Sequence, residues 1–436
     1  MRMVARLAAP AIAQQLLYTL VFLVDRAMLG HHGSASLASM QISGPLVWTT
    51  VSLLSASTVG TVALVGRAVG AGDRALATAA VRGSLWFAGV VGVGVSLVGL
   101  LTLPVVPLLF PAAGEDVLVE AEGYLTVFLP SIPLFLLSFT GAAALTAAGD
   151  TKTPFIIGAV GNVINIALNY VLIFGHYGAP ELGAQGASFA SAAAMAWNAV
   201  VGLAVLSRRH GRVSFRGPGD ALAALRRMLK VAGPSAAERA VQQLGFLGFV
   251  MMIGALGGSV MAANQALISI ESICWLSAEG FGIAAAAVVA QRLGAGRRLD
   301  AAVAAKAATM MAVAFLSLFA AMFLLIPEVL LRAFTDDDAI VAMGLPVMVI
   351  AAVAQPFLAF SMVMSHALRG AGETRAPFVI MVLGGLVVRL FATWLFAFPL
   401  GLGLVGIWIG STVDWVVRAA LLGWVFFRGG WRDVAV

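Results

Sequence analysis

The 436-residue sequence has few charged residues and a single cysteine. Only 11% of its residues are charged, against about a quarter in soluble domains, while 61% are hydrophobic. A soluble fold of this size would lack the polar side chains needed to cover its core. Most soluble enzymes and disordered proteins are therefore excluded. The lone cysteine, Cys274, also excludes an internal disulfide and a cysteine-based metal cluster.

Long apolar runs recur along the whole chain. A membrane-spanning helix needs about 20 mostly apolar residues. A bilayer admits only helices or closed barrels, and these runs are too long for barrel strands. The sequence therefore predicts an all-α polytopic membrane protein with twelve transmembrane helices. The expected spans are 6–29, 43–68, 80–109, 118–147, 154–175, 183–207, 229–253, 262–290, 302–326, 339–368, 376–398 and 402–427.

The basic residues are unevenly distributed between the two sides of these spans. With both termini in the cytoplasm, 21 of the 26 Lys and Arg residues lie inside and only Arg26 and Arg332 lie outside. The positive-inside rule then predicts a multi-pass plasma-membrane protein with cytoplasmic termini. Because this distribution already explains the net charge of +6, we expect no nucleic-acid partner.

The two halves of the sequence resemble each other at a nearly constant offset. Residues 70–74 match 294–298 at a separation of 224, and residues 148–155 match 371–378 at 223. Each half has six spans, so the halves share one orientation. They predict two pseudo-symmetric six-helix lobes around a central cleft. The expected domains are an N-terminal lobe at 1–207, a cytoplasmic linker at 208–228 and a C-terminal lobe at 229–436.

The repeated motifs predict turns between helices. Gly-Ala-Gly at 70–72 and 294–296 follows a long apolar helix rather than a strand, which favours a helix C-terminal turn over a phosphate loop. In the Gly-Asp/Glu-Thr motifs at 149–151 and 372–374, the threonine or its neighbour is expected to cap the next helix.

Taken together, these motifs resemble the multidrug and toxic compound extrusion (MATE) family. Pro10, Asp25 and Gly30, the run Gly-Asn-Val-Ile-Asn at 161–165, and Gly-Ser-Thr-Val-Asp-Trp at 410–415 follow that family's pattern across essentially the whole chain. Among prokaryotic members, the chain is similar to the DinF-like branch.

The resemblance implies a secondary active antiporter rather than an enzyme. It would export amphipathic, cationic organic compounds or drugs by alternating access, in exchange for H⁺ or Na⁺. The expected partners are small-molecule substrates and the lipid bilayer, with the monomer as the functional unit. No cofactor is expected beyond the coupling ion.

The first lobe carries the main candidate for ion coupling. Ionisable residues within spans are costly to bury and are candidates for function. Asp25 lies toward the outer end of span one, and a carboxylate there can carry a proton. The resemblance implies that Asp25 forms a cation site with Asn165, Asn169 and Ser191 of spans five and six.

The composition of this site bears on the coupling ion. Many family members have an aspartate where this chain has Asn169. Its absence leaves one carboxylate, which suffices for a proton and weakens, without excluding, a Na⁺ site at Asp25. Two structural alternatives stay open. Asp25 could pair with Arg26 at the outer surface, and Asn165 and Asn169, on one helix face, could only join helices by hydrogen bonds.

Further candidates lie in the second half. Glu238 in span seven, Glu271 in span eight and Met252 are candidate substrate-binding residues. Some branches of the family use a span-seven acid together with a span-ten aspartate, which is absent here. The alternative role for Glu238 is to pair with Arg239 or Arg418.

Other polar residues of the second half receive a structural interpretation. Asp414 and Arg418 are four residues apart and are expected to pair on one helix surface. His366, near the inner end of span ten, is expected to be solvated, and Glu279 in span eight receives no assigned role.

Two other functions compete with drug export. A flippase for lipid-linked precursors, from the same superfamily, would favour a strongly cationic cleft, and few arginines are expected there. An integral membrane enzyme would need His/Asp or His/Glu sets at helical spacing within spans, and no such set is evident in the sequence.

The charge asymmetry gives a direct topological prediction. A cysteine introduced in the linker at Ser214 should react with a membrane-impermeant thiol reagent only from the cytoplasmic side. Labelling from outside intact cells would contradict the predicted orientation.

Overall fold

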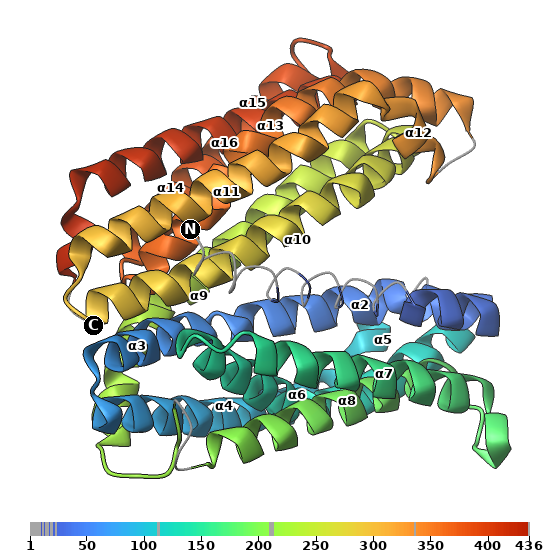
Figure 1. Ribbon diagram of the computed structural model, residues 1–436. Helices are drawn as coiled ribbons and strands as arrows, with labels where there is room; N and C mark the ends of the chain where they lie inside the picture. The colour runs from blue at the N-terminus through green and yellow to red at the C-terminus, as the bar shows by residue number, and fades with distance from the viewer. Residues whose placement is uncertain are drawn as a thin grey trace. The chain divides into compact units, whose positions relative to one another are not determined.

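The computed structural model is built from long helices and contains no strand among the residues it describes (Figure 1). It describes residues 24–110, 114–208, 213–334 and 337–434, together with the isolated positions 10, 13, 17 and 21. Within these residues, ten helices are long and apolar enough to cross a membrane. Most of the first expected span lies outside the described residues. The seventh lies in a helix that is less apolar.

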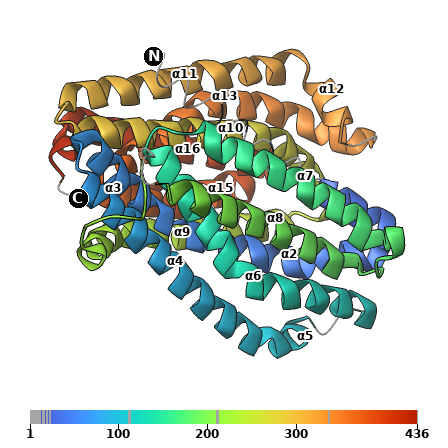
Figure 2. The same ribbon diagram turned by 60° about the horizontal axis from the view of Figure 1, so that its bottom comes forward.

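Residues 13–230 form one compact unit. Residues 24–32 are helical and are followed by further helices that run side by side in Figures 1 and 2. These are α2 (Ser34–Ser55), α3 (Ser57–Ala71), α4 (Arg74–Thr102), η1 (Leu103–Val105), α5 (Val106–Leu109), α6 (Glu115–Ala147), α7 (Lys152–Phe174), η2 (His176–Gly178) and α8 (Gly183–Leu206).

Residues 231–436 belong to the second compact unit. Helix α9 (Ala221–Ala255) begins in the first unit and continues into the second. The other elements are α10 (Gly258–Gly294), α11 (Arg298–Leu325), α12 (Pro327–Arg332), α13 (Asp338–Gly370), α14 (Arg375–Ile380), η3 (Met381–Val388), α15 (Arg389–Ala397), α16 (Gly403–Arg428) and η4 (Gly430–Asp433).

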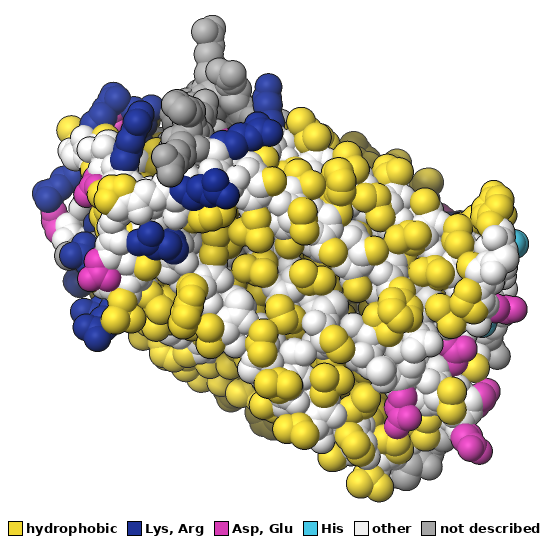
Figure 3. Space-filling model, turned by 90° about the horizontal axis from the view of Figure 1, so that it is seen from below, with side chains coloured by type: hydrophobic (Ala, Val, Ile, Leu, Met, Phe, Trp, Pro, Cys, Tyr) yellow, Lys and Arg dark blue, Asp and Glu magenta, His cyan; other side chains and the backbone are white. Residues whose placement is uncertain are grey.

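The surface carries the expected segregation of charge. On the face shown in Figure 3, Lys and Arg side chains gather at one end, with some Asp and Glu among them, and a broad hydrophobic surface separates this end from the other, where the charged side chains are Asp and Glu. This pattern fits a protein whose middle lies in lipid.

The repeated turn motifs end and start helices, as predicted. Gly72 closes α3 with a left-handed φ of 72°, and the side chain of Asp73 accepts a hydrogen bond from the Leu76 N–H over 2.9 Å at the start of α4. In the next motif Asp150, the neighbour of the threonine, accepts from the Thr153 N–H over 3.0 Å. The acid rather than the threonine therefore supplies the cap.

The segment before α9 is held by the first unit. Arg82 of α4 donates to the carbonyl oxygens of Gly217, over 3.2 Å, and of Gly219. A Cβ on Gly60 of α3 would lie 2.5 Å from the Met228 carbonyl oxygen, so the first turns of α9 pack directly on α3. Ser214 is itself buried. The exposed Pro218 is therefore the better position for the labelling experiment.

Small residues bring α10 and α13 together in the second unit. Ala284 and Ala287 are fully buried, and a Cβ on Gly370 would lie 2.5 Å from the Ala286 Cα. Small side chains allow close helix approach where the solvent is lipid.

A wide helical turn interrupts the eleventh expected span. Residues Met381–Val388 adopt a π-helix between α14 and α15. Within it, Gly384 faces α16, and a Cβ there would lie 2.9 Å from the Asp414 Oδ1 and would also contact Arg418. The absence of a side chain at this position therefore makes room for the α16 charges.

This crowding predicts the effect of Gly384→Ala. The added methyl should lower the free energy of unfolding by about 1–3 kcal/mol, as expected for overpacking, and lower the thermal midpoint in detergent. Gly89→Ala on α4 is the control, since a Cβ there meets nothing within 4 Å. It should instead stabilise by about 0.5–1 kcal/mol. Equal midpoints for the two variants would contradict the packing argument.

Candidate functional site

The structure brings the four expected first-lobe residues together. Asn169 of α7 donates from Nδ2 to the Asp25 Oδ1 over 2.5 Å and to the Asn165 Oδ1 over 3.2 Å. Asn165 lies 3.3 Å from the Ser191 Oγ of α8. In the opposite orientation of its amide, Asn165 donates to the Asp25 Oδ1 over 2.9 Å in place of its bond from Asn169, and accepts from the Ser191 Oγ over 3.3 Å.

The chemistry of this cluster depends on one carboxylate. Asn165 and Asn169 are buried and Asp25 is half-buried. The amides hydrogen-bonded to Asp25 are neutral, so they orient the carboxylate without cancelling its charge. The cluster therefore changes its net charge by one when Asp25 gains or loses a proton. No group of three or more His, Cys, Asp or Glu suited to a metal ion occurs in the part of the chain that the structure describes.

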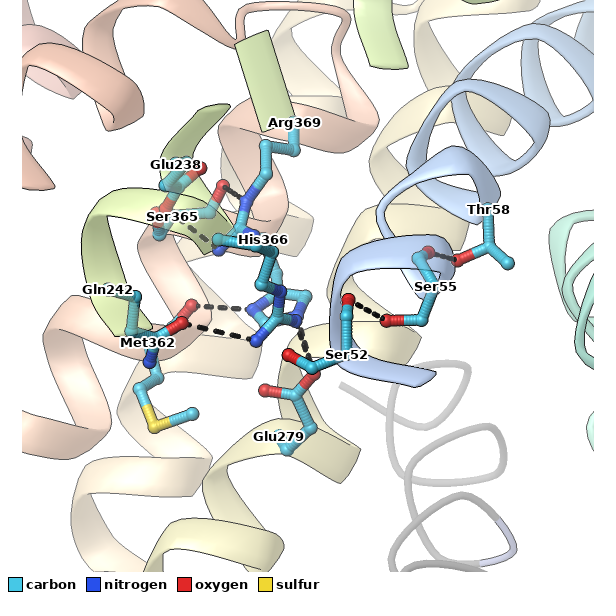
Figure 4. Close-up of polar contacts among 11 residues, drawn as sticks. Ser52, Ser55, Thr58, Glu238, Gln242, Glu279, Met362, Ser365, His366 and Arg369 are labelled. Atoms are coloured by element: carbon cyan, nitrogen blue, oxygen red, sulfur yellow. Dashed lines mark hydrogen bonds and ion pairs between the residues drawn. The ribbon is translucent and has the colours of Figure 1, made fainter. Parts of the chain in front are cut away.

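A second polar cluster surrounds a cavity within the C-terminal unit (Figure 4). The cavity has a volume of about 50 Å³ and is lined by α9, α10, α13, α14, η3 and α16, which is room for a few water molecules. On its wall, the Glu238 Oε1 lies 3.8 Å from the Arg369 Nη2. The other oxygen of Glu238 is buried and has no hydrogen-bond partner in the described structure. Glu238 thus pairs with Arg369 of α13.

Glu279 of α10, which also lines the cavity, joins three helices. Its Oε1 lies 3.1 Å from the His366 Nε2 of α13 and 3.6 Å from the Arg239 Nη2 of α9. Arg239 also donates to the Gln242 Oε1 over 3.3 Å. The expectation that His366 is solvated is wrong: its side chain is only 12% exposed.

A third charged group is the expected pair on α16. The Asp414 Oδ2 lies 2.5 Å from the Arg418 Nη2, which confirms that pair. The same oxygen lies 2.8 Å from the Arg389 Nε of α15, and the Arg418 guanidinium stacks 3.8 Å from the centre of the Trp415 ring.

The structure does not bring the three substrate-binding candidates into one cavity. Glu271 accepts a hydrogen bond from the Gln355 Nε2 over 3.2 Å, and Met252 is partly buried against the hydrophobic core of the second unit. Of the three, Glu238 alone lines the cavity described above.

Comparison with known proteins finds the same repeat. The MatE family model matches residues 10–171 and again residues 234–395. Two similar relatives are each described as a probable multidrug resistance protein NorM. The one from Thermotoga maritima is 30% identical over 99% of this chain and 93% of its own. The one from Pseudomonas putida is 30% identical over 97% and 93%.

Solved structures of similar fold cover the whole chain. One is the outward-facing conformation of a multidrug resistance MATE family transporter of the MOP superfamily, with a TM-score of 0.90 and 22% identity over 99% of this chain and 96% of that one. Another is a MOP superfamily transporter from Pyrococcus furiosus with a TM-score of 0.89 and 21% identity over the same shares. These likenesses support the two-lobe, twelve-helix fold. The DinF-like branch stays a prediction.

The geometry around Asp25 predicts how the site responds to a second acid. Asn169→Asp would place two carboxylates in hydrogen-bond range, which disfavours the doubly ionised state unless a cation lies between them. We expect NaCl, compared with an equal concentration of choline chloride, to raise the thermal midpoint of this variant more than that of the wild type. The same NaCl effect on both proteins would contradict the prediction.

Proposed function

We propose that this chain, which belongs to the MatE family of transporters, exports amphipathic organic cations in exchange for protons. Its relatives are transporters rather than enzymes, and this multi-pass membrane protein would work by alternating access of its lobes as a monomer. We further propose lobes at 1–207 and 229–436 and cytoplasmic termini. The linker at 208–228 would move with the first lobe, because Arg82 holds it there.

The observation that carries the proposal is the contact between Asp25 and Asn169. An ionised carboxylate within a span is costly in lipid, and neutral amide donors only partly reduce that cost. Binding a proton removes the charge, so the lobe can change its access to the two sides. With a single carboxylate, the site carries enough charge for one proton and less negative charge than a hard cation such as Na⁺ prefers.

The alternative of a lipid-precursor flippase is less well supported. It would favour an excess of cationic side chains that could hold an anionic group. In the C-terminal unit, however, four buried or half-buried arginines have acidic partners: Arg369 contacts Glu238, Arg239 contacts Glu279, and Arg389 and Arg418 share Asp414. Little uncompensated positive charge is left for such a ligand.

The decisive variant for coupling is Asp25→Asn. It keeps the shape of the side chain and removes its ability to bind and release a proton. In proteoliposomes with separately imposed proton and sodium gradients, we expect proton-driven export to fall to background while substrate binding to purified protein persists. A permanent amide fixes the site in its neutral form, so the ion cycle cannot turn over.

A matched control separates coupling from general damage. Asp116→Asn changes an exposed carboxylate of the same lobe and should leave export unchanged. Near-normal proton-driven export by well-folded Asp25→Asn would refute the mechanism. If export by the wild type follows the sodium gradient alone, the coupling ion is Na⁺ rather than the proton.

A further inference from the structure

Both ring nitrogens of His366 lie against hydrogen-bond acceptors. The Nδ1 is 3.0 Å from the Met362 carbonyl oxygen, one turn earlier on α13, and the Nε2 is 3.1 Å from the Glu279 Oε1 on α10. The ring lies close to the backbone of α10 at Gly282. Gly282 leaves space for it, and a Cβ there would lie 2.7 Å from the His366 Cγ.

If His366 were neutral and Glu279 ionised, these two contacts would lack one proton. A neutral imidazole has a single N–H, and an ionised carboxylate or a carbonyl offers only lone pairs. If Nδ1 donates to Met362, then Nε2 and Oε1 face each other with lone pairs unless a proton lies between them. That proton can sit on the histidine or on the glutamate, and either form satisfies both contacts.

We propose that Glu279 and His366 form a second proton-binding site, in the C-terminal lobe and separate from Asp25. The side chains are 11% and 12% exposed, so an unpaired contact between them would be costly. Both residues line the 50 Å³ cavity, and water there can deliver and remove the proton.

Charged side chains of the neighbouring helices surround the pair of Glu279 and His366. Arg239 on α9 lies 3.6 Å from the same Glu279 oxygen and Arg369 of α13 adds positive charge. Glu238 of α9 and Arg418 of α16 also line the cavity, whereas the lining residues of α14 are the uncharged Pro377 and Ile380, and α11 contributes none in the described structure.

Release of the proton would weaken a contact between helices. The pair joins α10 to α13, and Arg239 adds α9 to the same oxygen. Loss of the proton leaves two lone pairs in contact and weakens this junction. The binding of the proton stands on the geometry alone. Only its use as a second coupling ion rests on the proposed function.

Two spectroscopic measurements test the site on the full-length protein in nanodiscs. The ¹⁵N signals of labelled imidazole rings report how many ring nitrogens of His366 carry a proton, and His366→Gln identifies its signals among the five histidines. Infrared difference spectra between wild type and Glu279→Gln report whether Glu279 is a protonated acid. We expect either a doubly protonated ring or a protonated Glu279 near neutral pH, with loss of one proton as the pH rises.

Glu279→Gln should abolish the doubly protonated ring at pH values where the wild type shows it, because the carboxylate that favours the second N–H is gone. Glu271→Gln is the matched control. It removes a carboxylate from the same helix that bonds to Gln355 rather than to His366, and it should leave the His366 signals unchanged. A singly protonated ring beside an ionised Glu279 at neutral pH would overturn the proposal.

The same spectra of Asp25→Asn separate this inference from the proposed function. If the pair still binds its proton while neither wild type nor variant couples export to a proton gradient, the site stands and the proposed coupling fails. If proton-driven export is intact in the wild type but the pair shows no extra proton, this inference fails and the proposed function stands.

Discussion

The cost of charge within a bilayer governs the polar interior of this protein. Insertion scales place one charged side chain at the centre of a span at about 2.5–3.5 kcal/mol. Two kinds of contact reduce this cost in the described structure. In the second lobe, Asp414 and Glu279 lie against arginines or histidine, while Glu271 is bonded to the neutral amide of Gln355. In the first lobe, Asp25 is hydrogen-bonded to Asn169, a neutral amide.

The fold makes these contacts by placing small residues where helices must approach. Gly282 accommodates the His366 ring, and Gly384, within a π-helical turn, accommodates the Arg418 side chain. Such widened turns often accompany functional sites. Charged side chains and the glycines opposite them therefore form one structural unit, and a methyl group at such a glycine disturbs the charge contact and the packing together.

Much of the fold could be predicted from the sequence, because membrane spans, capping motifs and the repeat are local or periodic signals. The Asp25 group was predicted through family resemblance, and the structure brings its members together while its role stays a prediction. The pair of Glu279 and His366 could not be predicted. Its members are 87 residues apart, and their meeting depends on how α10 and α13 are rotated about their axes, which residue spacing does not encode.

The repeat shows that corresponding positions of the two lobes differ in chemistry. At the offset of 224, the counterpart of Asp25 is Phe249, and at 223 the counterpart of Ser191 is Asp414. Arg389 lies 5.6 Å from the centre of the Phe249 ring and also contacts Asp414. The second lobe thus holds an acid shared by two arginines where the first holds an acid bonded to an amide. The contact of Glu279 with His366 differs from both of these groups, because it is incomplete without a proton, and it is there that we place the second proton-binding site.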